Sequence, residues 1–183
     1  MSKFIEKKLT DIFTPHQGNA IYTRKNVVSL GWEGNIPVIS SDVDNTGILC
    51  YIAKNKLQRE KDLINYPCIT WTVDGMAGTL TARNYPFVPN NHCGWLTPKV
   101  EGLDLDYLVF VMQAQFYNCA KNSSNKKVGN NQIKNLTIKL PIKDDGNFDL
   151  EEQQRLAGVY SEIENQKQKL LSRIYDIQEL LIH

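Results

Sequence analysis

Apolar residues recur every seven positions through the last part of the chain. Two such series, offset by four residues, begin at Leu156 and Tyr160 and run almost to the last residue. Side chains at this spacing share one narrow face of an α-helix, as in a coiled coil. The positions of this seam are Leu156, Tyr160, Ile163, Lys167, Leu170, Ile174, Ile177 and Leu181. We therefore predict a helix roughly 50 Å long, at about 1.5 Å per residue, whose apolar face pairs with another helix.

The predicted start of this helix is polar. Asp149, followed three residues later by Glu152, has the spacing of a capping box.

Within the seam, Lys167 occupies a core-type position. We favour an interpretation in which its aliphatic stem packs while its ammonium group reaches water. The alternative is that Lys167 sets the register and orientation against a partner helix.

The chain before this helix alternates short apolar runs with polar turns, which predicts a sheet-containing head. A helix is predicted over residues 104–119, capped by Asp104 or Asp106. Residues 3–13 have helical or short-turn spacing, residues 14–26 are predicted to be a polar loop, and residues 86–98 mix strand and loop. Strands are predicted at 36–41, 48–53, 68–73, 80–85 and 136–142. The fold class is therefore α+β: a mixed-sheet head over 1–148, then one coiled-coil-forming helix over 149–183.

The formal net charge of +1 hides a difference between these two parts. Residues 1–143 hold 17 Lys/Arg against 11 Asp/Glu, a net of +6, whereas residues 144–183 hold 4 against 9, a net of −5. Residues 107–143 contain six lysines and no acidic residue. If the protein contacts a polyanion, we therefore expect the head, and not the helix, to make that contact. A solvated surface without such a partner is the alternative interpretation.

Several classes of function lack their usual sequence signals. No apolar run approaches the roughly 18 residues that span a membrane, and the first residues do not resemble a secretion signal, so we expect a cytoplasmic protein without a membrane partner. The four cysteines form no CxxC pair, and the three histidines complete no zinc spacing. No nucleophile elbow, Walker loop or HExxH helix occurs. We expect no catalytic residue, no metal and no cofactor bound by this chain.

Polar side chains from several predicted loops have the chemistry needed to contact duplex DNA. Lysine and arginine neutralise phosphates, while amides and hydroxyls bond base edges or the backbone. For the most basic loop, 121–132, a disordered solvated segment is the alternative. Trp32, Trp71 and Trp95 are assigned to the core instead. The candidates are Arg24, Lys25, Ser41, Asp42, Asn45, Thr46, Arg83, Asn84, Asn91, Lys121, Asn122, Lys126, Lys127 and Asn130.

Five segments follow, in order, the pattern of a known family. They are IPVISS…DNTGILCYI (36–52), TVDGMAGT (72–79), DYLVFVMQAQ (106–115), NNQIKNLTIKLPI (130–142) and DLEEQQRLAGVYSEIENQKQKL (149–170). Together they resemble the target-recognition domain and helical spacer of type I restriction–modification DNA-specificity subunits. The resemblance implies that the head reads half of a split sequence in double-stranded DNA and that the spacer sets the half-site distance. It also implies a non-catalytic subunit that positions a methyltransferase subunit, which uses S-adenosylmethionine, and a translocase–nuclease (restriction) subunit.

This chain departs from that family in having one recognition domain and one spacer instead of two of each. Either it is a half-length subunit that forms a homodimer, or it is a fragment of a longer chain. The heptad seam favours the homodimer, since two antiparallel helices would place the heads at opposite ends. Such a dimer would read an inverted repeat.

Two other functions are considered. A protein-interaction adaptor, antitoxin-like or inhibitory, would dock another helix through its C-terminal helix and bind protein through its head. A small hydrolase would use His92 and Cys93, but neighbouring residues on a strand point to opposite faces, which argues against the pair.

Overall fold

The computed structural model describes residues 3–30, 33–41 and 46–182, with side chains described except at positions 30 and 180–182. Its largest sheet has four antiparallel strands in the order β2-β8-β5-β6. These strands are β2 (Phe13–Gln17), β8 (Cys93–Pro98), β5 (Cys68–Thr72) and β6 (Leu80–Arg83). Burial along β5 is continuous except at its end, because both faces of this strand are covered.

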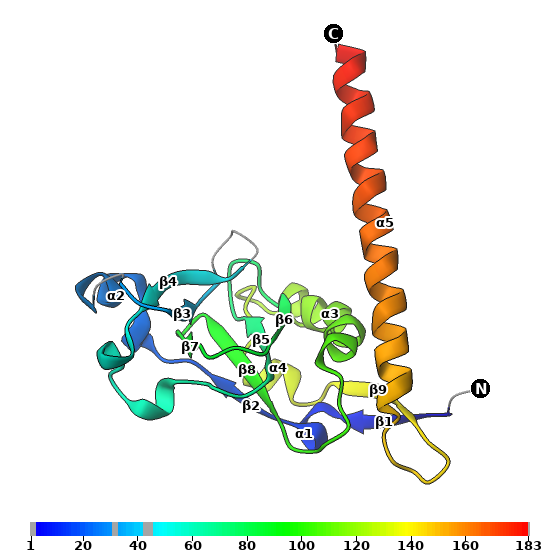
Figure 1. Ribbon diagram of the computed structural model, residues 1–183, viewed down its shortest axis with the longest axis horizontal. Coiled ribbons are helices and arrows are strands. Elements are labelled where there is room, and N and C mark those ends of the chain that lie inside the picture. The colour runs from blue at the N-terminus through cyan, green and yellow to red at the C-terminus, as the bar shows by residue number, and fades with distance from the viewer. Residues whose placement is uncertain (1–2, 31–32, 42–45, 183) are drawn as a thin grey trace.

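Two smaller sheets flank the four-stranded one. The order β4-β3-β7 joins β4 (Ile48–Ile52) antiparallel and β7 (Val88–Pro89) parallel to β3 (Ile36–Ile39). This sheet lies at the end of the head remote from the C-terminal helix (Figure 1). The other sheet pairs β1 (Lys3–Lys8) with β9 (Thr137–Ile142), and so brings the two ends of the head's sequence together. The expected mixture of antiparallel and parallel strands is therefore confirmed.

One long helix covers the four-stranded sheet. Helix α3 (Leu105–Asn122) begins at Asp104, whose Oδ1 accepts a hydrogen bond from the Tyr107 amide at 2.8 Å, so the cap is Asp104 and not Asp106. Its buried face includes Leu108, Met112 and Phe116. Phe116 contacts Trp71 edge-on, with ring centroids 6.0 Å apart. Trp71 is buried as predicted, Trp95 is only half-buried, and Trp32 lies outside the described residues.

The remaining elements of the head are short. They are α1 (Leu9–Ile12), η1 (Ala20–Tyr22), α2 (Arg24–Leu30), η2 (Lys54–Lys56), η3 (Glu60–Asp62) and α4 (Asn130–Ile133). Residues 3–13 were expected at helical or short-turn spacing, but they form β1, one turn of helix and the start of β2. The reason is pairing: β9 supplies a partner strand 129 or more residues away. The expected loop over 14–26 likewise holds most of β2, η1 and the start of α2.

Helix α5 (Leu150–Ile182) has two parts, a base docked on the head and a length that projects from it (Figure 1). At the base, Gln153 is fully buried; its Oε1 accepts from the Asp104 amide at 3.0 Å and its Nε2 donates to the Gly102 carbonyl at 2.9 Å. The Asp149 carboxylate caps α5 by accepting from the Glu152 amide at 3.1 Å. The Asp149 amide donates to the Pro141 carbonyl of β9 at 2.9 Å, so β9 also holds the start of α5.

Within the described ranges, no helix, α5 included, is both long enough and apolar enough to cross a lipid bilayer.

Candidate nucleic-acid interface

Loops that are distant in sequence meet at one edge of the head, and backbone hydrogen bonds hold them together. The Val128 amide donates to the Val73 carbonyl at 2.8 Å, and the Val73 amide donates to His92 at 2.9 Å. The Asn90 amide donates to Ile39 at the end of β3. The polar residues around these bonds, all exposed or half-exposed except the buried Asn90, are named here the loop surface. Its members are Thr23, Arg24, Ser40, Ser41, Asp74, Asn90, Asn91, His92 and Lys127.

Asp74 lies at the centre of the loop surface, in the turn between β5 and β6. Its Oδ1 lies 2.6 Å from His92 Nδ1, and its Oδ2 lies 3.1 Å from Lys127 Nζ. Burial raises the pKa of the Asp74 carboxyl, but the hydrogen bonds and charges of Lys127 and His92 outweigh it, so the pKa is lowered overall. One carboxylate thus ties together the turn after β5, the loop before β8 and the loop after α3.

The turn that carries Asp74 packs directly on α3. Gly78 has φ +88°, and a Cβ at this position would lie 2.6 Å from the Phe116 carbonyl oxygen, so only glycine allows this approach. The segment DGMAGT is therefore a turn between strands, in agreement with the absence of the GxGxxG pattern of a phosphate loop.

A cavity of about 220 Å³ opens within the loop surface. It is lined by Thr23, Arg24, Ser40, Ser41, Leu49, Asn90 and His92. Asn90 is almost fully buried; its Nδ2 donates to Ser40 Oγ at 2.9 Å, and its Oδ1 accepts from the His92 amide at 2.8 Å. Buried polar groups that are satisfied in this way hold the surrounding loops in one arrangement.

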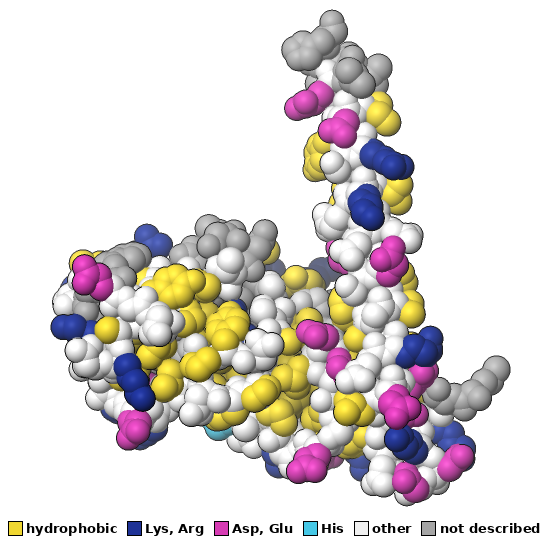
Figure 2. All heavy atoms as spheres, viewed as in Figure 1, with side chains coloured by type: hydrophobic (Ala, Val, Ile, Leu, Met, Phe, Trp, Pro, Cys, Tyr) yellow, Lys and Arg dark blue, Asp and Glu magenta, His cyan; other side chains and the backbone are white. Residues whose placement is uncertain are grey.

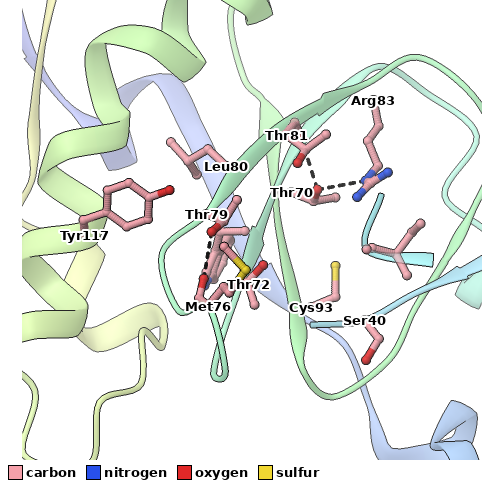
Figure 3. A pocket seen from close by; sticks show the side chains of 13 residues that line it. Ser40, Thr70, Thr72, Met76, Thr79, Leu80, Thr81, Arg83, Cys93 and Tyr117 are labelled. Atoms are coloured by element: carbon pink, nitrogen blue, oxygen red, sulfur yellow. Dashed lines mark hydrogen bonds between the residues drawn. The ribbon is translucent and has the colours of Figure 1, made fainter. Parts of the chain in front are cut away.

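Arg83 was expected to project towards DNA, and this prediction is wrong. Its side chain is only 4% exposed. Nε donates to Thr70 Oγ1 at 2.9 Å, Nη2 donates to the Thr46 carbonyl at 3.0 Å, and Nη1 donates to the Tyr85 hydroxyl. A buried charge needs such partners, which only the folded sheet provides. Arg83 lies at one side of a second cavity, of about 280 Å³, with Tyr117 at the other (Figure 3).

Arg24, Ser41, Asn91 and Lys127 are brought together on the loop surface, and the other predicted contacts are not among its members. Lys25, Thr46, Asn84, Lys121, Asn122 and Lys126 are exposed, and Asn130 is half-buried at the start of α4. Asn122 lines a separate cavity beside Cys119 and Gln132. Asp42 and Asn45 lie outside the described residues.

The predicted contacts did not include Thr23, Ser40, Asp74, Asn90 or His92, although the sequence already placed all of these except Thr23 in polar loops able to project from the head. Two of these residues, Ser40 after β3 and Asn90 after β7, follow directly on buried strands, and Asp74 comes two residues after the end of β5. A polar residue just beyond a buried strand is the sequence signal that could have found them.

Cys93 is buried and not activated, which excludes its pairing with His92 as a nucleophile. Burial raises the pKa of the Cys93 thiol to about 12. The neighbouring His92 ring instead contacts Asp74. Cys50 and Cys68 are buried free thiols as well. Within the described part of the chain, no three His, Cys, Asp or Glu side chains gather as metal ligands would.

The seam of α5 is covered at its base and open beyond it. Leu156 packs against the head's own core, and the Tyr160 ring lies 5.6 Å from that of Phe110 on α3. Farther along, Ile163, Leu170, Ile174 and Ile177 are each half-exposed or more, at 50–59%. Figure 2 shows apolar side chains along the projecting length of α5, interspersed with charged ones. Lys167 Nζ lies 3.1 Å from Glu164, and the Leu181 side chain lies outside the description.

The head and helix together define a class of protein: a mixed α+β module that gathers polar loops at one edge and is carried on an extended helix. The model of the type I restriction modification DNA specificity domain matches residues 1–173, so the chain belongs to this family. The resemblance inferred from the sequence motifs is therefore confirmed.

Solved structures show the same fold. The S subunit of a type I restriction–modification system from M. genitalium aligns with TM-score 0.64 and 17% identity, over 98% of this chain and 45% of its own. HsdS from Thermoanaerobacter tengcongensis aligns with TM-score 0.62 and 15% identity, over 89% and 38%. A chain from a study of type I R-M assembly and conformational transition aligns with TM-score 0.67 and 18% identity, over 91% and 40%.

The α+β fold class with a long C-terminal helix is confirmed by these alignments. This chain spans less than half the length of the solved structures that it matches. No curated protein matches it.

Proposed function

We propose that this chain recognises a sequence in double-stranded DNA through its loop surface, as the specificity component of a restriction–modification complex. The observation that carries the proposal is the convergence of Arg24, Ser41, Asn91 and Lys127 on one edge of a head that belongs to a DNA specificity family. Lysine and arginine neutralise phosphates, and hydroxyls and amides read base edges. Arg83 is not among the contacts, because it is engaged within the protein.

In this proposal the chain contributes no catalytic group and binds no cofactor. A methyltransferase subunit supplies the chemistry with S-adenosylmethionine, and a restriction subunit completes the complex. The chain's part is to place both subunits on a chosen sequence.

Selection from a random duplex library tests recognition directly. Purified protein, alone and with its methyltransferase subunit, retains duplexes that are sequenced over successive rounds. We expect one motif to become enriched and retention to weaken as salt rises. Retention without enrichment of any motif, with the methyltransferase subunit present, would contradict sequence recognition.

We further propose that two copies pair through the free part of α5 in antiparallel orientation. The exposed seam from Ile163 to Ile177 supports pairing, because a second helix packed along it would bury these apolar side chains. Antiparallel pairing is favoured by Lys167: a parallel dimer would place each Lys167 at the same level as its copy, where like charges repel. Two antiparallel copies would place the loop surfaces far apart, on an inverted repeat.

Sedimentation equilibrium tests the pairing. A mass of two chains at micromolar concentration is expected. The mass of one chain, measured without any partner subunit, would contradict self-assembly.

A further inference from the structure

A groove of about 760 Å³ lies at the base of α5, on the side of the head remote from the β4-β3-β7 sheet. Its apolar and aromatic lining comes from three elements: Phe4 and Ile5 on β1, Tyr107 and Val111 on α3, and Tyr160 on α5. Phe4 is half-exposed. A patch of exposed apolar surface with polar residues at its margin is typical of a docking site.

The groove is continuous with the seam of α5. Leu156 is packed against the head's core, so the seam is closed at its first position. Tyr160, the next position, lines the groove and is 38% exposed, and Ile163 after it is 57% exposed. A helix that packed along the open seam towards the head would therefore arrive at the groove.

The open seam is short for a coiled coil. From Ile163 to Ile177 it spans two heptads, and Lys167 interrupts it. Stable coiled coils usually sustain the repeat over about three to four heptads. A dimer held by this stretch alone would be weak, so the proposed pairing of two copies needs further apolar surface beside the seam.

Antiparallel pairing has one register that uses the whole open seam. In this register the Lys167 side chains of the two copies are staggered, and each can pass a leucine and reach water. The end of one α5 then lies beside the base of the other. The facing positions are Lys167 with Leu170, Ile163 with Ile174, and Tyr160 with Ile177.

The charges of the two surfaces are complementary. After Arg173, α5 carries Asp176 and Glu179 and no lysine or arginine up to its end at Ile182. Strands β1 and β9, which border the groove, hold four lysines and one glutamate. Lys139 lines the groove with its side chain 71% exposed, and its Nζ lies 3.7 Å from Glu6. An acidic helix end would thus meet a surface of opposite net charge.

We propose that the groove binds the C-terminal end of α5 from a second copy of this chain, with Ile177 of that copy against Tyr160. By the two-fold symmetry of such a dimer, each head binds the other copy's helix end. The proposal rests on the proposed pairing of two copies and deepens it, because it names the surface of the head that completes the interface and fixes the register of the helices.

Disulfide cross-linking tests the register. Tyr160→Cys and Ile177→Cys are combined in a chain that also carries Cys119→Ser, because Cys119 is partly exposed whereas the other three cysteines are buried. Oxidation should convert most of the protein to a covalent dimer on a non-reducing gel, since a disulfide forms when the two Cα atoms lie within about 7 Å. Either single variant should give no covalent dimer, because equivalent positions of the two copies lie far apart.

Affinity of the dimer tests the groove itself. Phe4→Asp should raise the dissociation constant at least roughly tenfold, because a charge replaces apolar surface at both grooves of the dimer. Tyr51→Asp is the matched control: Tyr51 is a similarly exposed aromatic residue on β4, outside the groove lining, and its loss should not change the dissociation constant. Melting temperatures show whether each variant is folded.

A charge exchange tests the electrostatic contact without altering the apolar lining. Lys139→Glu should weaken the dimer roughly threefold at about 0.05 M salt and less at about 0.5 M, since exposed charges are screened. Adding Glu179→Lys to the same chain should restore most of the affinity. Lys61→Glu, on η3 and outside the groove lining, makes the same change of charge and should have no effect.

The outcomes separate this proposal from those on which it rests. A wild-type protein of one-chain mass would overturn both the pairing and the groove, and DNA recognition would stand. A dimer of unchanged affinity in Phe4→Asp, or one that forms no disulfide between positions 160 and 177, would overturn the groove assignment alone.

Discussion

The base and the free length of α5 carry the same seven-residue pattern, yet they have different partners. At the base, Leu156 and Tyr160 lie against the head, and Gln153 is buried with both polar atoms bonded. Beyond Ile163 the same pattern lies open. The heptad spacing therefore indicates an apolar face and does not indicate whether that face is covered within the chain or by a second molecule.

Two adjacent lysines, Lys127 on the loop surface and Lys126 outside it, show a similar contrast. Lys127 pairs with Asp74, whereas Lys126 is exposed and its Nζ donates to the Lys121 carbonyl at 3.5 Å. Asp74 therefore holds Lys127 in place while the Lys127 side chain stays 49% exposed, so both lysines can still reach a phosphate. Each prediction below tests one side of this comparison.

The largest effect is expected in the free seam. Leu170→Asp should raise the dissociation constant of the proposed dimer roughly a hundredfold or more, since two buried leucines contribute about 1.5–3 kcal/mol each. Analytical ultracentrifugation measures the change. The melting temperature of the head should hardly move. As a matched control, Arg173→Ala alters a charged position outside the seam and should leave the mass at two chains.

A smaller but firm effect is expected at the docked base. Gln153→Leu leaves the Asp104 amide and the Gly102 carbonyl without their partner, and each unsatisfied buried group costs about 1–3 kcal/mol. The free energy of unfolding should fall by about 2–4 kcal/mol in chemical denaturation. Gln166→Leu, on the exposed length of α5, should cost less than about 0.5 kcal/mol. Equal losses in the two variants would mean that α5 is not docked at its base.

Variants of Lys126 and Lys127 distinguish an effect on stability from an effect on DNA binding. Lys126→Ala with Lys127→Ala should weaken binding to all sequences and flatten the salt slope by about 1.8, if each lysine neutralises one phosphate. Of the two single variants, only Lys127→Ala should lower the melting temperature, because only Lys127 holds Asp74. An unchanged salt slope in the double variant would remove this loop from the interface.

The smallest effect concerns pH. The folded pKa of Asp74 is lowered, so its contribution to stability is present above the unfolded carboxyl pKa and is lost as the pH falls through the folded value. The contribution should be below about 1 kcal/mol, because Lys127 and His92 are both partly exposed to solvent. Comparing unfolding of wild type and Asp74→Asn from neutral to acidic pH measures it. A difference between the two that grows as the pH falls would contradict the sign.

Local patterns predicted much of the secondary structure. Alternation placed β5, and the spacing of Leu108, Met112 and Phe116 placed α3 with its cap. Both depend on residues that are close in sequence. The N-terminal segment was misjudged because β1 depends on β9, and pairing between distant strands leaves little trace in a short window. Arg83 was misjudged for the same reason, since its partners Thr70 and Thr46 lie 13 and 37 residues away.

The sequence by itself determined the α+β class, the family resemblance and the existence of an apolar face on a long C-terminal helix. Each of these follows from the spacing of nearby residues or from the order of motifs along the chain. Only the tertiary structure decided which part of that face is covered, which cations remain open and which loops share an edge. These outcomes depend on contacts between residues far apart along the chain, where burial and hydrogen bonding are decided jointly by all the packed elements.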